Sequence, residues 1–319
     1  MVARRRGGGG PGVSSSALDP LDIVDPDHEH SHIGEEVERR LRRADRRRGF
    51  LLALPAYLYM VLFFAVPLVI VLIYSFATRT SSGSVALSGW NLESYRKLGE
   101  PIVRNVVFRS AFLAAITTVV CLLVGYPYAY FAATRRPLVR NLLLVAVMIP
   151  FWTNFLVRNY SWRLLLSTGG PISSATEAIG LGETDLLFTR TAVVLGLTYS
   201  FLPFMILPLY ASIERIDWRL VEASRDLYSS GWKSFSKIVF PLSLPGVIAG
   251  SILVFVPSLG AYVTPEILGG GRETMLGSYI VTQFLTARNW PVGASVSFVL
   301  MAVMLSATIV YFRAGGKNL

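Results

Sequence analysis

A polar, charged segment at residues 214–243 separates two long apolar stretches and carries the side chains best suited to a specific chemical role. The apolar side chains of its first half recur at helical spacing, at Leu220, Ala223 and Leu227. Those of its second half do the same, at Trp232, Phe235 and Val239. Asp217 stands where a helix N-cap is expected, and Gly231 permits a sharp turn between the halves. The segment therefore predicts two short helices that present apolar anchors with charged flanks.

The chemistry available to this segment is non-covalent docking. Apolar anchors with charged flanks fit a groove on a soluble partner protein. They also fit the surface of a bilayer, on which an amphipathic helix can lie. The pattern alone leaves both roles open.

Motifs for catalysis and for cofactor binding are missing from the sequence. A phosphate-cradling loop needs Gly-x-x-x-x-Gly-Lys-Ser/Thr, and the chain has no such run. The single cysteine, Cys121, cannot form an intrachain disulfide or a zinc site. The histidines at 28, 30 and 32 fit a solvated tail better than a metal site. We therefore expect no catalytic residue, no metal site and no cofactor bound by this chain itself.

The composition is that of an integral membrane protein. Hydrophobic residues make up 53% of the chain and charged residues 16%, with a mean hydropathy of +0.52, whereas a soluble domain carries about 25% charged residues. A bilayer span needs about 20 apolar residues. Six stretches are long enough, near 50–77, 105–133, 141–163, 190–213, 244–264 and 293–313. The expected fold class is all-α, with residues 49–319 forming the transmembrane domain.

Basic residues predict the orientation of these spans. Of the 30 Lys and Arg residues, 20 lie in the N-terminal tail, in the 134–140 and 214–243 loops and at the C-terminus. These segments are expected in the cytoplasm, both termini included. Topology signals and anionic lipid contacts account for the net charge of +10. Nucleic-acid binding is not expected, because no basic surface interleaved with aromatic residues appears.

Residues 1–48 differ in composition from the rest of the chain. Glycine, serine and acidic residues dominate the first part, and arginines the last. Such a segment cannot bury a core, so we expect a disordered cytoplasmic N-terminal tail. Its length and charge do not fit a secretory signal peptide.

Residues 222–241 resemble the EAA loop of prokaryotic ABC importer permeases, which reads Glu-Ala-Ala, three residues, Gly, nine residues and Ile-x-Leu-Pro. Four positions match this pattern, at Glu222, Ala223, Ile238 and Pro241. Three depart from it, at Ser224, Tyr228 and Phe240, where the pattern has Ala, Gly and Leu. If the Gly of the pattern adopts a positive φ, a tyrosine there is strained by about 1 kcal/mol. Gly231, three residues later, is then an alternative place for the turn.

The resemblance implies a six-helix type I ABC importer permease with a cytoplasmic coupling helix, in the inner membrane of a prokaryote. In that family the loop docks onto the ATP-hydrolysing subunit, which implies coupling residues at Glu222, Ala223, Ser224, Leu227 and Gly231. The implied partners are an ABC ATPase homodimer that binds ATP and Mg²⁺, a second homologous permease and an extracytoplasmic solute-binding protein. Membrane lipid surrounds the assembly.

Further stretches resemble the first permease of spermidine/putrescine importers. They are residues 149–158, 202–210, 263–270 and 289–293, and the likeness extends over essentially all of 50–313. Relatives that import ferric iron, thiamine or other small solutes share part of these stretches. The resemblance therefore implies import of polyamines, with another small solute as the alternative.

A pathway for a polyamine must attract a flexible polycation weakly at several places. Glu266, which follows Pro265 at the outer end of the fifth expected span, is the best-placed carboxylate. Trp152 and Tyr199 are candidates for aromatic faces that attract cations. Each also fits an ordinary role, as an interface charge or as a ring packed between helices.

A rival of a different class is an ion-driven secondary transporter. It predicts charged residues at the middle of the membrane and an internal inverted repeat. The chain has few of the former and no convincing repeat, so the importer permease is the favoured interpretation.

Overall fold

The computed structural model describes residues 53–80, 85–87, 90–178, 180 and 185–315. The predicted tail, residues 1–48, lies outside the described residues. The chain divides into two units, Met1–Val66 and Pro67–Leu319. The first helix among the described residues is Ala53–Ser75, and its most apolar 18-residue window has a mean hydropathy of 2.7.

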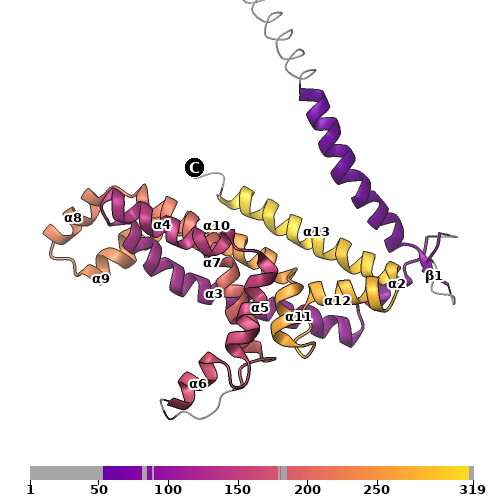
Figure 1. Ribbon diagram of the computed structural model, residues 1–319. Helices are drawn as coiled ribbons and strands as arrows, with labels where there is room; N and C mark the ends of the chain where they lie inside the picture. Colours follow the sequence, from indigo (N-terminus) through magenta and orange to yellow (C-terminus); the bar gives the residue numbers. More distant parts are fainter. Residues whose placement is uncertain (1–52, 81–84, 88–89, 179, 181–184, 316–319) are drawn as a thin grey trace, which may run out of the picture. The chain divides into compact units, whose positions relative to one another are not determined.

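The second unit is helical throughout most of its described length (Figure 1). Its helices are α2 (Glu93–Lys97), α3 (Pro101–Ala133), α4 (Pro137–Trp152), α5 (Phe155–Leu166), α6 (Pro171–Ala178), α7 (Arg190–Glu214), α8 (Trp218–Asp226), α9 (Gly231–Ser234), α10 (Phe240–Leu259), α11 (Val263–Gly269), α12 (Leu276–Val281) and α13 (Trp290–Gly315). Two π-helical segments are η1 (Phe235–Val239) and η2 (Thr282–Thr286). The described strands are β1 (Thr78–Arg79) and β2 (Val85–Ala86), which pair antiparallel with Thr78 opposite Ala86. The predicted all-α class is confirmed.

The core of this unit lies where α3, α7 and α10 pack together. The side chains of Met205, Ile206 and Leu209 on α7 are fully buried there. Glycines on α10 allow the backbones to approach closely. A Cβ atom at Gly250 would lie 3.1 Å from the Met205 carbonyl oxygen, and one at Gly246 would lie 2.7 Å from another α7 carbonyl oxygen. The three helices therefore form the rigid frame from which the loops project.

Helices of membrane-spanning length match most of the expected spans. Four described stretches qualify by length and hydropathy, at Ala53–Ser75, Pro101–Ala133, Arg190–Glu214 and Gly231–Leu259. A fifth candidate is the bent pair Pro137–Trp152 and Phe155–Ala178. The last expected span falls on α13, whose stretch Trp290–Ser306 is a shorter apolar helix. Six straight spans are therefore not what the described residues contain.

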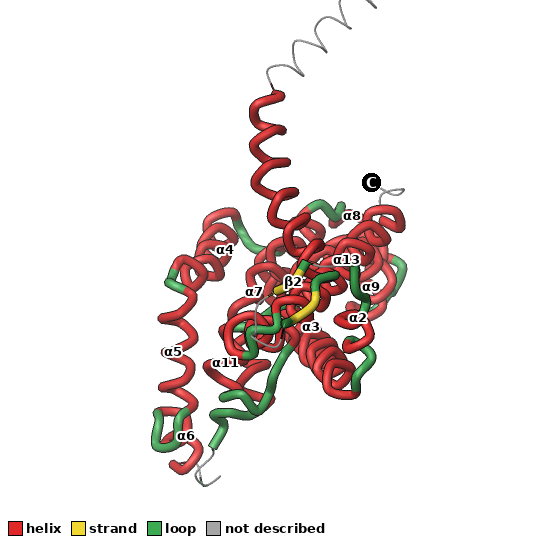
Figure 2. Tube along the Cα trace, turned by 90° about the vertical axis from the view of Figure 1, so that its right-hand side faces the viewer, coloured by secondary structure: helices red, strands yellow, loops and turns green. Residues whose placement is uncertain are grey.

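The third expected span, near 141–163, is bent by 91° between α4 and α5, which Figures 1 and 2 show as two helices running in different directions. Thr153 is extended, with φ −72° and ψ 148°, and ends α4. Asn154 begins α5, because its side-chain oxygen accepts hydrogen bonds from two backbone amides of the first turn. Arg158 donates to the Pro150 carbonyl oxygen at 3.2 Å across the bend. An apolar count cannot reveal such a break, since both arms are hydrophobic.

Candidate functional site

The α8–α9 loop, residues 217–234, is the segment that the sequence marks as a docking element. Asp217 has an extended backbone, and its side chain accepts a hydrogen bond from the Arg219 amide at 3.0 Å. The predicted N-cap is therefore confirmed. Val221 faces inward and is buried, whereas Leu220 is half exposed. The helix thus turns one side to the core and leaves the other free.

Tyr228 makes the turn between α8 and α9. Its φ is 58°, in the left-handed region, and its amide donates to the Arg225 carbonyl oxygen at 2.9 Å. Gly231 is the first residue of α9 and does not make the turn, so the alternative placement at Gly231 is wrong. The physical reason is that Ser230 already has an extended backbone and caps α9, accepting from the Lys233 amide at 3.4 Å.

Two serine hydroxyls join the arms of the loop. The oxygens of Ser224 on α8 and Ser234 on α9 lie 2.7 Å apart. Ser234 is only 2% exposed, and Ser224 also lies 2.8 Å from the Val221 carbonyl oxygen. Ser224 therefore has a structural role at a position where the EAA pattern has Ala. Ser234 was not foreseen, because its partner is ten residues away and on another helix.

An aromatic cluster connects the loop to α3. The ring of Phe235, at the start of η1, meets Tyr126 of α3 edge-on with centroids 5.5 Å apart. The ring of Trp218, at the start of α8, meets Tyr130 of α3 with centroids 6.0 Å apart. The Tyr126 hydroxyl lies 2.8 Å from that of Ser243 on α10. Tyr126 and Tyr130 are four residues apart on one helical face, which is the signal that sequence reasoning missed.

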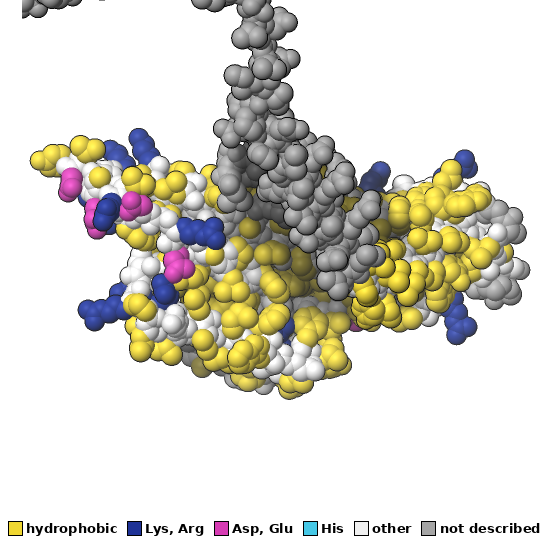
Figure 3. Space-filling view, turned by 90° about the horizontal axis from the view of Figure 1, so that it is seen from above, with side chains coloured by type: hydrophobic (Ala, Val, Ile, Leu, Met, Phe, Trp, Pro, Cys, Tyr) yellow, Lys and Arg dark blue, Asp and Glu magenta, His cyan; other side chains and the backbone are white. Residues whose placement is uncertain are grey.

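The tip of the loop is an exposed apolar surface. Leu227 is 82% exposed, Tyr228 is 100% exposed and Trp232 is 74% exposed. Glu222 and Ala223 are exposed as well. Figure 3 shows acidic, basic and hydrophobic side chains gathered at the end of the second unit where α8 and α9 lie. The five predicted coupling residues therefore belong to one compact element, with Ser224 turned inward and the other four exposed.

The second apolar stripe of the sequence is split between two environments. Val239 is buried and Phe235 packs on α3, whereas Trp232 is exposed and stacks on Phe235 at 5.5 Å. A π-helical turn rotates the side chains that follow it relative to an α-helix. Val239 and Phe235 therefore attach the loop to the helical frame, and Trp232 belongs to the exposed tip.

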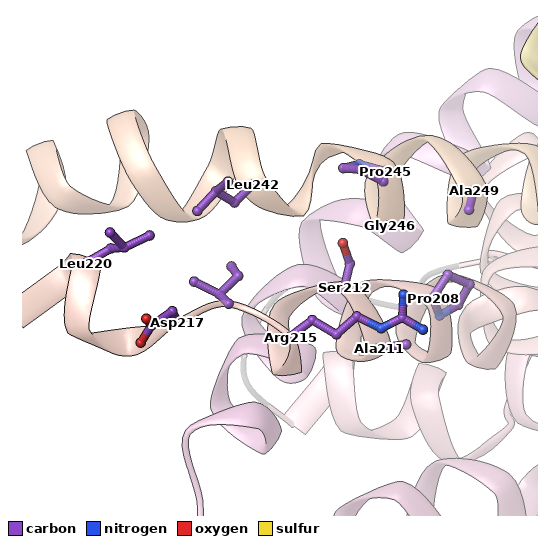
Figure 4. A pocket seen from close by; sticks show the side chains of 11 residues that line it. Pro208, Ala211, Ser212, Arg215, Asp217, Leu220, Leu242, Pro245, Gly246 and Ala249 are labelled. Atoms are coloured by element: carbon purple, nitrogen blue, oxygen red, sulfur yellow. The ribbon is translucent and has the colours of Figure 1, made fainter. Parts of the chain in front are cut away.

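A groove of about 500 Å³ lies where α7, α10 and the start of α8 meet (Figure 4). Its wall is mainly apolar, with Arg215 and Asp217 as its charged residues. In Figure 4 the Arg215 side chain runs along α7 toward Ala211 and Pro208. The groove separates the beginning of α8 from α10.

The three predicted pathway residues lie on three different helices. Trp152 ends α4 and is 80% exposed. Tyr199 on α7 meets the ring of Trp162 edge-on at 5.5 Å, and the Arg158 guanidinium lies 5.8 Å from its centroid. Glu266 is exposed in the first turn of α11. Among the described residues no hydrogen bond, ion pair or ring contact joins these three, and their pathway role stays a prediction.

A charge cluster missed in the sequence lies at the opposite ends of α3 and α7 from the loop. Glu273, in the α11–α12 connection, accepts from Arg190 Nε at 3.1 Å and has Arg109 Nε at 3.7 Å. Arg109 also donates to the Arg272 carbonyl oxygen at 3.0 Å. These residues are up to 164 positions apart in sequence numbering, from 109 to 273, so no local pattern could have joined them. They fix the α11–α12 connection to α3 and α7.

Metal chemistry has no support in the described part of the chain. No group of three or more His, Cys, Asp or Glu side chains that could hold an ion occurs among those residues. The arrangement at the loop is suited to binding another protein, by apolar contact and by mixed charges.

Known proteins share the sequence that builds this loop and its frame. A family described as "Binding-protein-dependent transport system inner membrane component" matches residues 125–315, from the Tyr126 end of α3 to the end of α13. The chain belongs to this family. The match covers the loop, the aromatic cluster and the charge cluster except for Arg109.

Two known proteins are similar to this chain over most of their length. The spermidine/putrescine transport system permease protein PotB of Escherichia coli K12 is 40% identical over 258 residues, covering 80% of this chain and 94% of the relative. The protein of the same name from Haemophilus influenzae is 39% identical over 258 residues, covering 80% and 90%. Both relatives are named as permease proteins of spermidine/putrescine transport systems.

The fold is also similar to a solved structure. A chain of the bacterial alginate ABC transporter, crystallised in complex with an alginate pentasaccharide-bound periplasmic protein, has a TM-score of 0.66 and 15% sequence identity. The likeness covers 86% of this chain and 96% of that chain. This chain therefore shares the fold of that transporter chain.

Proposed function

We propose that the chain is a permease subunit of an ATP-driven ABC importer of polyamines such as spermidine and putrescine. The observation that carries the proposal is the 39–40% identity to two PotB proteins over 258 residues. An alignment of 258 of the 319 residues includes the bent pair, α7 and the loop, whichever end of the chain it leaves out. In this role the chain forms part of the pathway and catalyses no reaction itself.

The proposed partner on the cytoplasmic side is an ABC ATPase homodimer. A tip with Leu227, Tyr228 and Trp232 exposed suits a groove on a soluble protein, because such a patch is costly to leave in water. ATP and Mg²⁺ would be bound by that ATPase, since this sequence has no phosphate-cradling loop. Glu222 and Ala223, exposed on α8, belong to the same docking face.

The aromatic cluster supports a mechanical role for the loop. Phe235 and Trp218 hold its two ends against Tyr126 and Tyr130 of α3. Packed aromatic contacts are rigid, so a displacement of the tip would move α3 and α10 rather than dissipate within the loop. We infer that closure of the ATPase dimer reaches the membrane-spanning helices by this route.

Two further partners complete the proposed importer. A second homologous permease would pair with this chain, and a solute-binding protein would deliver the substrate on the extracytoplasmic side. The periplasmic protein in the related alginate transporter complex supports the latter. The excess of Lys and Arg in the tail, in the 134–140 and 214–243 segments and at the C-terminus supports an inner-membrane orientation with both termini in the cytoplasm.

Reconstitution tests the substrate. Proteoliposomes are prepared with this chain, the second permease and the ATPase, and the solute-binding protein is added on the side opposite the ATPase. ATP is supplied on the ATPase side. Uptake of labelled spermidine and putrescine is then compared with uptake of ferric iron and thiamine. We expect uptake of the labelled polyamines to depend on ATP and to be inhibited by unlabelled polyamines. Uptake of only ferric iron or thiamine would replace the proposed substrate, and uptake driven by an ion gradient without ATP would reject the importer class.

A further inference from the structure

Tyr228 combines an unfavourable backbone with a side chain that contacts nothing in its own chain. Its φ of 58° is a conformation that only glycine adopts freely, and for a bulky residue it is an outlier. Its side chain is 100% exposed. Among the described residues no side-chain hydrogen bond, ion pair or ring contact involves it. The folded chain therefore gains nothing from this ring, although it bears the strain of holding it.

We propose that Tyr228 is a specificity anchor whose ring enters an apolar pocket on the ATPase subunit and selects that ATPase over others. The inference rests on the proposed function, in which the α8–α9 loop docks onto an ATPase. It goes further in naming one residue and one kind of pocket. A tyrosine supplies a large apolar surface with few rotatable bonds, which makes it a frequent anchor at protein interfaces.

The backbone around Tyr228 fixes the direction in which its side chain leaves the turn before a partner binds. Its own amide donates to Arg225, and the next amide, of Ser229, donates to the Ser224 carbonyl oxygen at 3.1 Å. The hydroxyl pair of Ser224 and Ser234 closes the loop behind it. Because the turn is already ordered, binding restricts only the rotation of the side chain and not the backbone, which favours affinity.

The neighbouring charges favour a protein partner over the bilayer surface. On the exposed side of α8, Glu222 and Asp226 alternate with Arg219 and Arg225. An anionic lipid surface attracts the arginines but repels the two carboxylates. A protein surface can complement both signs at once. The tip in Figure 3, where acidic and basic side chains surround hydrophobic ones, has this mixed character.

The test measures binding of the purified permease, paired with its second permease in detergent, to two ATPases. One is the cognate ATPase, which is the ATPase of this importer. The other belongs to an importer of the same family that carries a different substrate. We expect Tyr228→Gly to weaken binding to the cognate ATPase by about 10- to 100-fold, as for an anchor removed from an interface. Binding to the other ATPase should change by less than about 3-fold, within the range of a rim contact.

Two further variants separate a docking role from a structural one. Tyr228→Phe keeps the ring and should bind the cognate ATPase within about 3-fold of the unchanged chain. The thermal midpoint of the Tyr228→Gly permease should stay the same or rise, because glycine relieves the strained turn. A lower midpoint together with weaker binding to both ATPases would mean that Tyr228 only holds the fold, and would overturn the proposal.

Ala223→Asp distinguishes failure of this inference from failure of the proposed function. If Ala223→Asp weakens ATPase binding and Tyr228→Gly does not, the loop docks as proposed and Tyr228 is no anchor. If neither variant changes binding, the docking role itself is wrong. The full-length permease in vesicles of anionic phospholipid adds the remaining outcome. If a spin label on a Tyr228→Cys variant is shielded from a water-soluble relaxation agent when no ATPase is present, position 228 lies at the membrane surface and the proposal is overturned.

Discussion

Removing the ring of Phe235 should separate ATP hydrolysis from substrate uptake. Phe235 contacts Tyr126 edge-on at 5.5 Å, Tyr130 at 6.2 Å and Phe240 at 6.3 Å. Full removal of a buried Phe side chain costs about 3–5 kcal/mol. Phe235 is partly buried, so we assign about half of this, about 2 kcal/mol, to Phe235→Ala. A change of that size shifts the balance between attached and detached loop by about 30-fold.

The assay is the amount of polyamine taken up per ATP hydrolysed in proteoliposomes. We expect Phe235→Ala to lower this ratio by at least half. ATPase co-purification should be largely preserved, because of the three exposed tip residues only Trp232 has a ring contact with Phe235, and Leu227 and Tyr228 remain. Phe235→Leu is the matched control, since it keeps apolar bulk in the same place and should retain most of the coupling. A Phe235→Ala permease that keeps normal uptake per ATP would refute the inference that the aromatic cluster transmits the movement.

Three further predictions concern other parts of the chain. Deletion of residues 2–45 should leave uptake largely intact at normal membrane insertion, because their composition offers no core and no coupling motif; loss of uptake would reveal a specific partner. Glu266→Gln should raise the KM for a polyamine at low salt and less at high salt, since an exposed charge is screened; an unchanged KM at low salt would leave Glu266 as an interface charge. Glu273→Gln should lower the free energy of unfolding by about 1 kcal/mol, a value kept small because Arg190 and Arg109 are partly exposed; thermal denaturation of the purified permease measures it, and an unchanged midpoint would show that the cluster adds no stability.

Local features of the fold could be predicted because they depend on neighbours in the sequence. The Asp217 cap involves an amide two residues on, and the helical spacing of Leu220 and Leu227 is a property of one short segment. Apolar length likewise identified α3, α7 and α10 as spans. The two short helices of the 214–243 segment could be predicted because a charged segment between two apolar stretches is visible in composition alone.

The remaining features depend on contacts between distant segments. The Ser224–Ser234 pair, the meeting of Tyr126 with Phe235 and the pairing of Glu273 with Arg190 each need the folded frame. The bend between α4 and α5 was hidden because both arms are apolar, and it shows only in how Asn154 and Arg158 satisfy the backbone there. None of these changes the hydropathy or the periodicity of the sequence.

The base and the tip of the α8–α9 loop differ in how they are held. Its base is held by ring contacts from Trp218 and Phe235 to α3, which favour a single arrangement. At its tip, Tyr228 has a positive φ of 58°, and its fully exposed side chain makes no contact among the described residues that would offset this strain. Strain of this kind persists where the surrounding structure enforces it, and it is typical of functional sites. If the tip docks on an ATPase as proposed, this packed base would pass a displacement of the tip on to α3, because packed contacts deform little.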